Sequence, residues 1–473
     1  MPEPRTPIAI LGAGPAGMGA ALCLARRGRF EVTVIERQQQ VGGNAGSFDI
    51  AGLRVDYGSH RLHPACPPEI LADIRAMLGA DLLDRPRHGR IRLRGRWVHF
   101  PLKPLDLARG LPLGFSFGVA RDAIGKLRRR READTFEGVL REGLGRTICR
   151  DFYFPYARKI WGAEPAELDA EQARRRVSAG SLSKMVRKVL NAVPGLKPPG
   201  AGRFYYPRRG YGQISEAYYC AALKAGAKVR LGATVAGVER DQNGGTVAVR
   251  IREQEEETRL PARQILSTIP LSILVRSISP APPDDVLAAA AALRSRAMLL
   301  IYLVLETERF TEFDAHYFPD AGVAITRLSE PKNYGLAELP GRTVLCAELP
   351  CSTSDAVWNA SDDELGRLVK DSLAAAGLPV RAPLGQVAVR RLPHAYPIYT
   401  RDYREHFDRL DRWVSGIEGL ITFGRQGLFV HDNTHHTLAM AYALSECLDD
   451  KGRLDRARWE SRRREFERHV VED

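Results

Sequence analysis

The chain has 473 residues, 44% of them hydrophobic, so it is long enough for more than one domain and can fill sizeable hydrophobic cores. It shows no apolar run near the roughly 20 residues of a transmembrane segment, and its seven cysteines are scattered without a CxxC pair. Because the predicted first strand starts near the N-terminus, we expect no signal peptide, and we expect a cytoplasmic protein with reduced thiols. The net charge of +13 predicts an anionic partner, and because no nucleic-acid-binding motif accompanies the arginine runs, we expect a small anionic substrate or an acidic membrane surface and no nucleic acid.

The first 36 residues predict a dinucleotide-binding unit. An apolar run at 8–11 leads into GAGPAG at 12–17, a helical pattern follows, and a second apolar run at 32–35 ends at Glu36. In this arrangement the glycines permit a tight turn and close approach of a pyrophosphate, and the acid accepts hydrogen bonds from a ribose. The helix N-terminus offers N–H groups to the pyrophosphate. The cofactor-binding residues expected here are Gly12, Gly14, Pro15, Ala16, Gly17, Glu36 and Arg37.

A second glycine cluster, VGGNAGSFDI, follows at 41–50. NAD dehydrogenases have no general need for it. Flavoproteins of the glutathione-reductase type often place bare backbone there, beside the pyrophosphate and ribityl chain of FAD. We therefore expect FAD as the cofactor, bound in part by Gly42, Gly43 and Asn44, with an ordinary glycine loop as the alternative.

Two histidines, His60 and His63, follow the next predicted strand in VDYGSHRLHP at 55–64. Their spacing could suit a metal ion, but no carboxylate or cysteine cluster accompanies them, and we expect no metal site in the chain. Two interpretations stay open, namely a loop against the isoalloxazine ring of the flavin and ordinary packing.

The rest of the chain predicts two further regions and a return to the first. Helices and loops before residue 205 suggest a cap, in which the apolar and then basic segment 110–131 is expected to be a buried helix, with membrane contact as the alternative. A strand pair is expected at 228–240 with its turn at Gly232. The expected boundaries are an FAD-binding domain at 1–65, 205–275 and 415–450, a mainly helical cap and substrate region at 66–204, a mixed-sheet substrate domain at 276–414, and a charged C-terminal helix or tail at 451–473.

Several segments resemble those of the UDP-galactopyranose mutases. Their flavin-side loop has a tyrosine–glycine–x–histidine–x–x–histidine pattern, which 57–63 matches residue for residue, and FYFPYARKIWGAEPAEL at 152–168 is similar to a second mutase segment. The resemblance implies that Trp161 stacks on the base or sugar and that Arg175 clamps the diphosphate of a nucleotide sugar, a task that suits a planar bidentate donor. A surface arginine is the alternative. The matching residues are Tyr57, Gly58, His60, His63, Lys159, Trp161, Gly162, Pro165, Glu167 and Leu168.

The resemblance continues toward the C-terminus. YPIYTRDY at 396–403 forms an aromatic and cationic cluster, in which Tyr396, Tyr399 and Arg401 are expected to contact the substrate. GRQGLFVHDNTHH at 424–436 is similar to the glycine–arginine turn that ends these proteins. The residues implied to face the cofactor are Gly424, Arg425, Asn433, Thr434, His436 and the backbone of Val235, and those implied to take part in catalysis are His60, His63, Arg175 and Arg425.

The chain also departs from the mutases. Phe429 and Asp432 stand where the mutases carry tyrosines that hold the diphosphate, and 95–104 is closer to oxidase-like relatives in polysaccharide pathways. The chain is identified as a member of the superfamily that includes the mutases, protoporphyrinogen oxidase and the amine oxidases. This implies an α/β fold, with a glutathione-reductase-type FAD-binding Rossmann domain, an inserted α+β substrate domain and a helical cap.

Two activities stay open on this resemblance. The first is the redox-neutral interconversion of ring forms of a nucleotide diphosphate sugar through an adduct at N5 of reduced FAD. The second is hydride transfer from a substrate C–N or C–C bond to the flavin, in polysaccharide or natural-product biosynthesis. A non-catalytic flavin-binding protein is a third interpretation, and a homodimer stays open.

Overall fold

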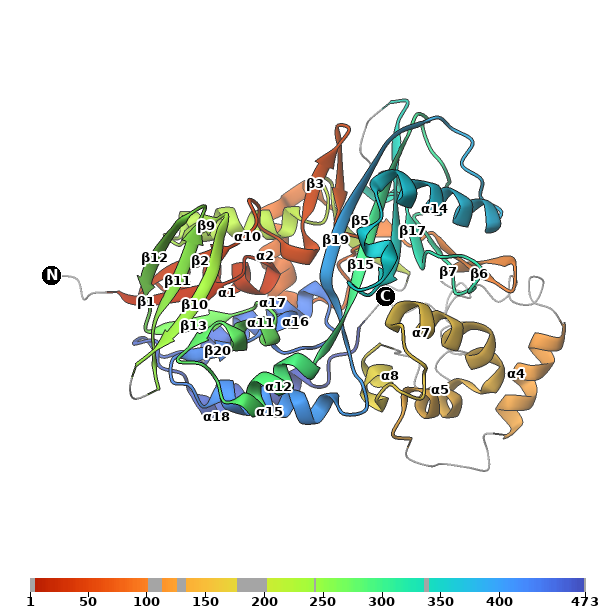
Figure 1. Ribbon diagram of the computed structural model, residues 1–473. Coiled ribbons are helices and arrows are strands. Elements are labelled where there is room, and N and C mark those ends of the chain that lie inside the picture. The colour runs from red at the N-terminus through yellow and green to blue at the C-terminus, as the bar shows by residue number, and fades with distance from the viewer. Residues whose placement is uncertain are drawn as a thin grey trace.

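The computed structural model describes residues 5–100, 113–125, 133–176, 202–241, 244–335 and 340–471 (Figure 1). Its organising element is a five-stranded parallel sheet in the order β20-β13-β1-β2-β9. Because the strands run the same way, their carboxyl ends share one edge, where ligands bind in folds of this type. The strands are β1 (Thr6–Leu11), β2 (Phe30–Glu36), β9 (Lys228–Leu231), β13 (Gln264–Ser267) and β20 (Leu420–Thr422).

Both faces of this sheet are covered, which explains its nearly continuous apolar strands. Successive side chains of a strand point to opposite faces, so Ile8 and Ile10 pack in a core with helices, whereas Ala9 and Leu11 pack in a second core. The first core is formed with α1 (Pro15–Arg26), α2 (Pro68–Leu78), α10 (Gln213–Lys224), α17 (Thr434–Glu446) and α18 (Arg456–Phe466).

The second core is formed with a four-stranded sheet and three helices. The sheet has the order β12-β11-β10-β14. Its strands are β10 (Ala233–Arg240), β11 (Thr246–Glu253), β12 (Glu256–Pro261) and β14 (Ile278–Ser279), and the helices are α11 (Leu271–Arg276), α12 (Asp284–Ala292) and α15 (Tyr403–Ser415).

The strand pair expected at 228–240 is present, but its two strands do not form a hairpin. β9 pairs with β2 in the parallel sheet, whereas β10 pairs with β11 and β14 in the second sheet. Gly232 stands between them with a φ of +71°, a backbone conformation that suits glycine. The turn therefore carries the chain from one sheet to the next.

The third large element is a mixed seven-stranded sheet in the order β19-β15-β18-β17-β16-β6-β7, in which only β16 and β6 pair in parallel. Helix α14 (Asp362–Ala375) packs on it, and its start is fixed by a capping box between Ser361 and Glu364. The strands are β6 (Gly89–Leu93), β7 (Arg96–Phe100), β15 (Arg294–Leu305), β16 (Ala315–Tyr317), β17 (Arg327–Ser329), β18 (Thr343–Cys351) and β19 (Leu384–Ile398).

The expectation of mainly helices and loops at 66–204 is wrong for 82–100. There β6 and β7 form a hairpin at the edge of the seven-stranded sheet. Arg94 and Gly95 both have a positive φ, of 51° and 78°, as a tight two-residue hairpin turn requires. In β6, Ile91 and Leu93 are buried and alternate with arginines, a period-2 pattern that overrides the helical interpretation.

Helices gather at one end of the molecule, against the seven-stranded sheet (Figure 1). They are α4 (Leu113–Gly125), α5 (Phe136–Leu144), α6 (Arg146–Ile148), α7 (Phe154–Trp161) and α8 (Ala170–Arg176), with a π-helical turn at Cys149–Tyr153 between α6 and α7. Of the predicted cap helix at 110–131, α4 covers 113–125, and the remainder lies outside the described residues. Phe115 is buried in this helix, whereas Phe117 is 73% exposed.

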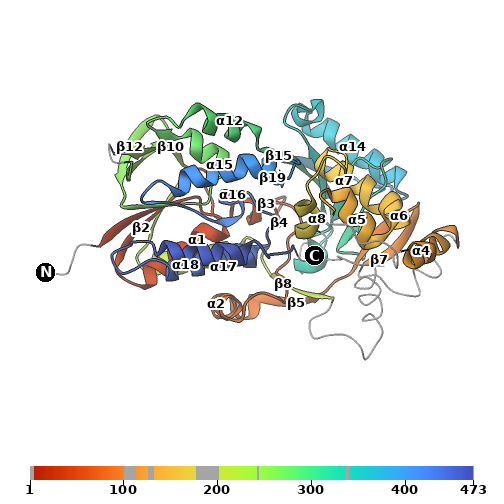
Figure 2. The same ribbon diagram turned by 90° about the horizontal axis from the view of Figure 1, so that it is seen from below.

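The remaining elements connect these layers. Figure 2 shows the C-terminal end of the described chain beside α8, where the Val471 N–H donates to the carbonyl of Arg175 over 2.8 Å. No described helix is long and apolar enough to span a bilayer. The connecting elements are β3 (Ser47–Ile50), β4 (Leu53–Asp56), β5 (Leu82–Pro86), β8 (Arg203–Pro207), α13 (Lys332–Gly335), α16 (Gly424–Gly427) and the 3-10 turns Gly43–Ala45, Gly79–Asp81 and Ala356–Asn359.

Candidate active site

The first glycine turn lies between the carboxyl end of β1 and the start of α1. Gly12 has a φ of +97°, and a Cβ there would lie 2.5 Å from Thr268 Oγ1, while a Cβ on Gly17 would overlap the Gly12 carbonyl oxygen. A Cβ on Gly14, in contrast, would meet nothing within 4 Å. Contacts within the protein therefore leave no room for a side chain at Gly12 and Gly17. Gly14, in contrast, faces open space where a ligand can approach the backbone.

No side chain among the described residues caps the N-terminus of α1. Pro15 occupies the first turn, no side chain caps the helix, and its first turn holds no acidic residue. The N–H groups beyond Pro15 and the positive end of the helix dipole thus point past Gly14 and Ala16 without a competing anion of the helix's own. A pyrophosphate fits this position.

Glu36 is buried at the carboxyl end of β2, next to the same turn. Its Oε2 accepts the Ala13 N–H over 2.8 Å and its Oε1 accepts the Gln38 N–H over 2.9 Å. Each oxygen keeps a lone pair for a further donor, such as a ribose hydroxyl. Arg37, which follows, is exposed.

The second glycine cluster docks directly on the first. The Gly42 N–H donates to the Ala13 carbonyl over 2.8 Å, and a Cβ on Gly43 would lie 3.5 Å from Gly14 Cα. Gly42 has a φ of +109°, and a Cβ there would lie 2.6 Å from Gly46 Cα. Asn44 reaches across the molecule, since its Nδ2 donates to the His394 carbonyl over 3.3 Å.

Three more predicted cofactor residues lie around this edge of the sheet. Gly424 follows β20 with a φ of +75°, and a Cβ there would lie 2.9 Å from Ala16 Cβ, so the glycine–arginine turn touches the start of α1. Val235 is half-buried on β10, just beyond Leu231, which pairs with Glu36. Thr434 begins α17, which packs along α1.

Asn433 and His436 form a capping box at the start of α17. The Asn433 N–H donates to His436 Nδ1 over 3.2 Å. Two helix N-termini, those of α1 and α17, therefore lie next to each other in the cofactor region, and the helices approach so closely that a Cβ on Gly19 would lie 2.9 Å from Leu438.

His60 and His63 are both engaged by the protein. His60 Nε2 lies 2.9 Å from the Tyr57 carbonyl, to which the neutral ring donates, and its ring stacks on Tyr211 at 5.3 Å between centroids. Burial lowers the pKa of His60, so the ring is neutral near pH 7. His63 Nδ1 accepts the Ala65 N–H over 3.1 Å. These contacts favour ordinary packing for His60, whose role beside the flavin stays a prediction.

The predicted substrate residues Trp161 and Tyr396 meet in one aromatic group. Their rings lie 5.8 Å apart between centroids, and the buried ring of His431 lies 5.2 Å from Trp161. Burial, followed by the charges of Arg176, Arg425 and Arg175, lowers the pKa of His431, and the Gln172 side-chain amide donates to its Nε2 over 2.9 Å. His431 is therefore a neutral acceptor inside a positive environment.

Two guanidinium groups lie against this aromatic group. Arg176 lies 5.4 Å from the Trp161 ring and 5.1 Å from the Tyr396 ring, and Arg425 lies 5.1 Å from the Tyr396 ring. Among the described residues, neither forms an ion pair with a carboxylate. Arg425 donates to the Ala395 carbonyl over 2.8 Å, yet its buried Nε has no hydrogen-bond partner in the described structure. Burial lowers the pKa of Arg425.

Arg175 differs from its neighbour Arg176. Its Nε donates to Glu171 over 2.8 Å, which neutralises the buried guanidinium, while its buried Nη1 has no hydrogen-bond partner among the described residues. Sequence comparison selected Arg175, but the structure brings Arg176 to the aromatic group. The sequence analysis did not predict Arg176, Gln172 or His431 as site residues. Gln172 and Arg176 stand four residues apart on α8, so they lie on one face of the helix, and this spacing could have indicated them.

Tyr399 lies at the edge of the aromatic group, with its ring 5.1 Å from that of His431, whereas Arg401 lies at the surface. Tyr399 is buried, stacks on Tyr403 at 4.1 Å and donates its hydroxyl to the Phe429 carbonyl over 3.0 Å. The Arg401 side chain is 58% exposed and pairs with Asp134 over 2.7 Å. The substrate role of both residues stays a prediction, and for Arg401 the geometry offers no support.

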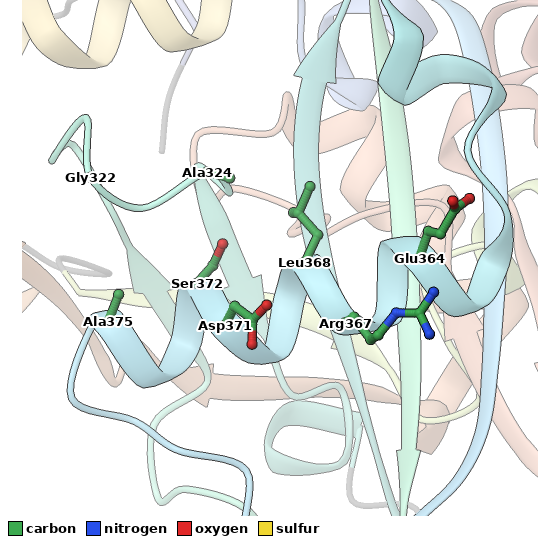
Figure 3. A pocket seen from close by; sticks show the side chains of 8 residues that line it. All are labelled: Gly322, Ala324, Glu364, Arg367, Leu368, Asp371, Ser372 and Ala375. Atoms are coloured by element: carbon green, nitrogen blue, oxygen red, sulfur yellow. The ribbon is translucent and has the colours of Figure 1, made fainter.

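An open hollow of about 610 Å³ lies elsewhere, on the outer side of α14 (Figure 3). Glu364, Arg367 and Asp371 project from the helix at its rim, and Gly322 and Ala324 close one side. None of the predicted site residues lines it, so we assign it no part in the chemistry.

The family of flavin-containing amine oxidoreductases matches residues 15–425. The chain belongs to this family. Because the family carries a flavin and the parallel sheet forms a dinucleotide site, the cofactor is FAD and the protein is a flavoenzyme of the FAD amine oxidase superfamily. The predicted cofactor, enzyme class and α/β fold are thereby confirmed.

Two curated proteins are similar to parts of the chain at low identity. The chain is 27% identical to phytoene dehydrogenase of Streptomyces griseus in an alignment of 307 residues that covers 58% of this chain and 56%, just over half, of that protein. It is 23% identical to polyamine oxidase 4 of Oryza sativa subsp. japonica in an alignment of 374 residues that covers 77% of this chain and 72% of that protein.

Solved structures show the same fold at low identity. A reduced UDP-galactopyranose mutase superposes with a TM-score of 0.78 at 18% identity, covering 94% of this chain and 93% of that one. Wild-type putrescine oxidase bound to putrescine superposes with a TM-score of 0.62 at 16% identity, covering 94% and 98%. At such identities the similarity extends to the fold alone.

Proposed function

We propose that this flavoenzyme acts on an anionic substrate whose charge is bound by Arg176 and Arg425, assisted by Arg175. The observation that carries the proposal is the pair of guanidinium groups beside the Tyr396 ring, neither of which is joined to a carboxylate in the described chain. Desolvating a cation without a counter-ion is costly. A bound anion removes that cost.

The substrate class that suits this group best is a nucleotide diphosphate sugar. Guanidinium forks bind phosphate oxygens in a bidentate manner, and the Trp161 and Tyr396 rings offer faces to a base or sugar. Within the family, cationic amines suit the site poorly, because Arg176 and Arg425 would repel them. The mutase-like segments at 57–63 and 152–168 support the same substrate class.

When bound, FAD supplies the redox or covalent chemistry at its isoalloxazine ring. The residues of this chain would bind the cofactor and the substrate and stabilise the charge that develops. The glycine turns and Glu36 hold the dinucleotide, Arg176 and Arg425 stabilise negative charge that develops on a departing diphosphate, and the aromatic group excludes water and orients the sugar. On this basis we propose a redox-neutral interconversion of ring forms of the sugar.

Net oxidation of an anionic substrate is the second candidate. It is favoured by the names of the two curated relatives, a dehydrogenase and an oxidase. Asp432 and Phe429, which replace the diphosphate-binding tyrosines of the mutases, favour it as well.

One turnover experiment separates the two candidates. The holoenzyme is incubated with UDP-galactose or UDP-galactofuranose, once oxidised in air and once reduced with dithionite under nitrogen. The proposal predicts isomerised nucleotide sugar only after reduction, without further consumption of the reductant. Conversion of nucleotide sugar that consumes oxygen and releases peroxide would support the second candidate instead, and no conversion of any nucleotide sugar in a panel would contradict the substrate class.

A further inference from the structure

A group of three potential metal ligands lies at the start of α17, beside the cofactor region. Asp432 precedes the helix, His436 lies in its first turn, and His469 comes from the segment after α18. One ligand atom from each residue lies within 4.8 Å of the other two. Since His469 is distant in sequence, no local motif marks the group, and the sequence alone predicted no metal.

The distances within the group match a metal site better than a hydrogen-bonded cluster. Asp432 Oδ1 lies 3.4 Å from His436 Nδ1 and 3.3 Å from His469 Nδ1. Ligand atoms at about 2.0–2.1 Å from a tetrahedral Zn²⁺ stand about 3.3–3.4 Å apart. Hydrogen bonds between nitrogen and oxygen are shorter, at about 2.9 Å, so both imidazoles stand at ligand distance from the carboxylate. Their rings stack on each other at 4.2 Å between centroids, so one ring must turn before both lone pairs meet a common ion.

The protonation state of the group also suits a cation. The Asp432 side chain is fully buried, and in the described structure its carboxylate has no polar partner closer than the two imidazoles, at 3.3 and 3.4 Å. Because His436 Nδ1 accepts the Asn433 N–H, that nitrogen carries a lone pair, as a metal ligand must. The contact is long, at 3.2 Å, and a metal ion could displace it. The buried His469 Nδ1 likewise has no partner in the described chain closer than Asp432.

We propose that Asp432, His436 and His469 bind a divalent cation of the zinc class. Two imidazoles and one carboxylate suit Zn²⁺, whereas Mg²⁺ and Ca²⁺ require several oxygen ligands. His436 and His469 are 13% and 19% exposed, so solvent can supply the fourth ligand.

The bound ion would fasten the end of the chain to the active-site region. His469 lies two residues before Val471, whose N–H donates to the carbonyl of Arg175 on α8. The site would therefore hold the 467–471 segment between α17, at the cofactor, and the helix that carries Arg175 and Arg176. This inference does not rest on the proposed substrate.

The test measures Zn²⁺ binding to the full-length, FAD-loaded protein after removal of metal with a chelator. Isothermal titration with Zn²⁺ alone should give one ion per chain. His469→Gln should weaken the affinity by at least the roughly 100-fold that loss of even a second-shell partner can cost. The control is His406→Gln, because His406 lies 3.4 Å from the carboxylate of Asp402, close to the 3.3 Å between His469 and Asp432, but Asp402 is 66% exposed.

A second measurement uses wild-type protein only, in case the His469 variant does not fold. Co²⁺ should produce a visible band at longer wavelength than the flavin absorption, and Zn²⁺ but not millimolar Mg²⁺ should abolish it. Absence of stoichiometric Zn²⁺ binding by the wild type, or equal affinity in His469→Gln and His406→Gln, would overturn the proposal. The three residues would then be an ion-paired cluster and nothing more.

Discussion

Replacing Arg176 by alanine perturbs the anion site most selectively. The guanidinium contacts the Trp161 and Tyr396 rings at 5.4 and 5.1 Å and forms no ion pair within the described chain. Its removal therefore leaves no acid unpaired, and folding loses only two ring contacts, each worth about 0.5–1 kcal/mol. We expect Arg176→Ala to fold and to retain its FAD.

The loss in substrate affinity should be larger than the loss in stability. A hydrogen bond to a charged group contributes about 1.5–3 kcal/mol, which weakens the Kd of UDP by roughly 10- to 150-fold. Arg176→Lys keeps the charge but not the planar fork, so it should recover only part of the affinity. The matched control is Arg174→Ala, which removes a 58% exposed side chain from the same arginine run.

The assay is isothermal titration of each FAD-loaded variant with UDP at low and high salt, together with Tm. Arg174→Ala should bind UDP like the wild type. A UDP Kd for Arg176→Ala within twofold of the wild-type value would refute the assignment. Equal weakening in Arg174→Ala and Arg176→Ala would refute it as well, because only the overall charge would then matter.

Three further predictions concern the cofactor, the surface arginine and acid stability. Gly14→Ala should fold but bind FAD more weakly, because its Cβ enters open space that the cofactor needs. Gly17→Ala should unfold the turn, because its Cβ overlaps the Gly12 carbonyl. Circular dichroism and FAD content after purification distinguish the two outcomes, and full FAD content in both variants would contradict the assigned cofactor site. Arg401→Ala should weaken UDP binding far less than Arg176→Ala, because its charge is already paired with Asp134 at the surface; the reverse order in calorimetry would restore Arg401 to the substrate site. Burial, helped by Arg90, lowers the pKa of His316 to about 3. An unfolded histidine titrates near 6.5, so the unfolded chain binds more protons between these values and Tm should fall as pH drops below about 6.5. The fall should be shallower in His316→Phe, and identical slopes would argue against a buried neutral ring.

The cofactor half of the site is encoded locally and was therefore predictable. The glycines at 12, 14 and 17, and the acid at 36, act within one strand–helix–strand unit whose spacing fixes their positions. The contact between the two glycine turns, from the Gly42 N–H to the Ala13 carbonyl, follows from the same short stretch.

The substrate half depends on contacts between distant segments, and there the sequence was less informative. Arg175 and Arg176 are adjacent and chemically identical, and only the packing of α8 decides that Arg176 meets Tyr396 while Arg175 meets Glu171. The exposed position of Arg401 depends on Asp134, more than 200 residues earlier. The β6–β7 hairpin was missed although β6 alternates apolar residues with arginines, the period-2 pattern that is typical of a half-buried strand.

The proposed function depends on the binding of an anion beside the flavin. The decisive measurement is titration of the oxidised holoenzyme with UDP while the visible flavin spectrum is recorded. We predict a saturable shift of the flavin bands with one UDP per chain, weakened by salt and absent with uridine. An unchanged spectrum and no heat of binding at millimolar UDP would contradict the anion site.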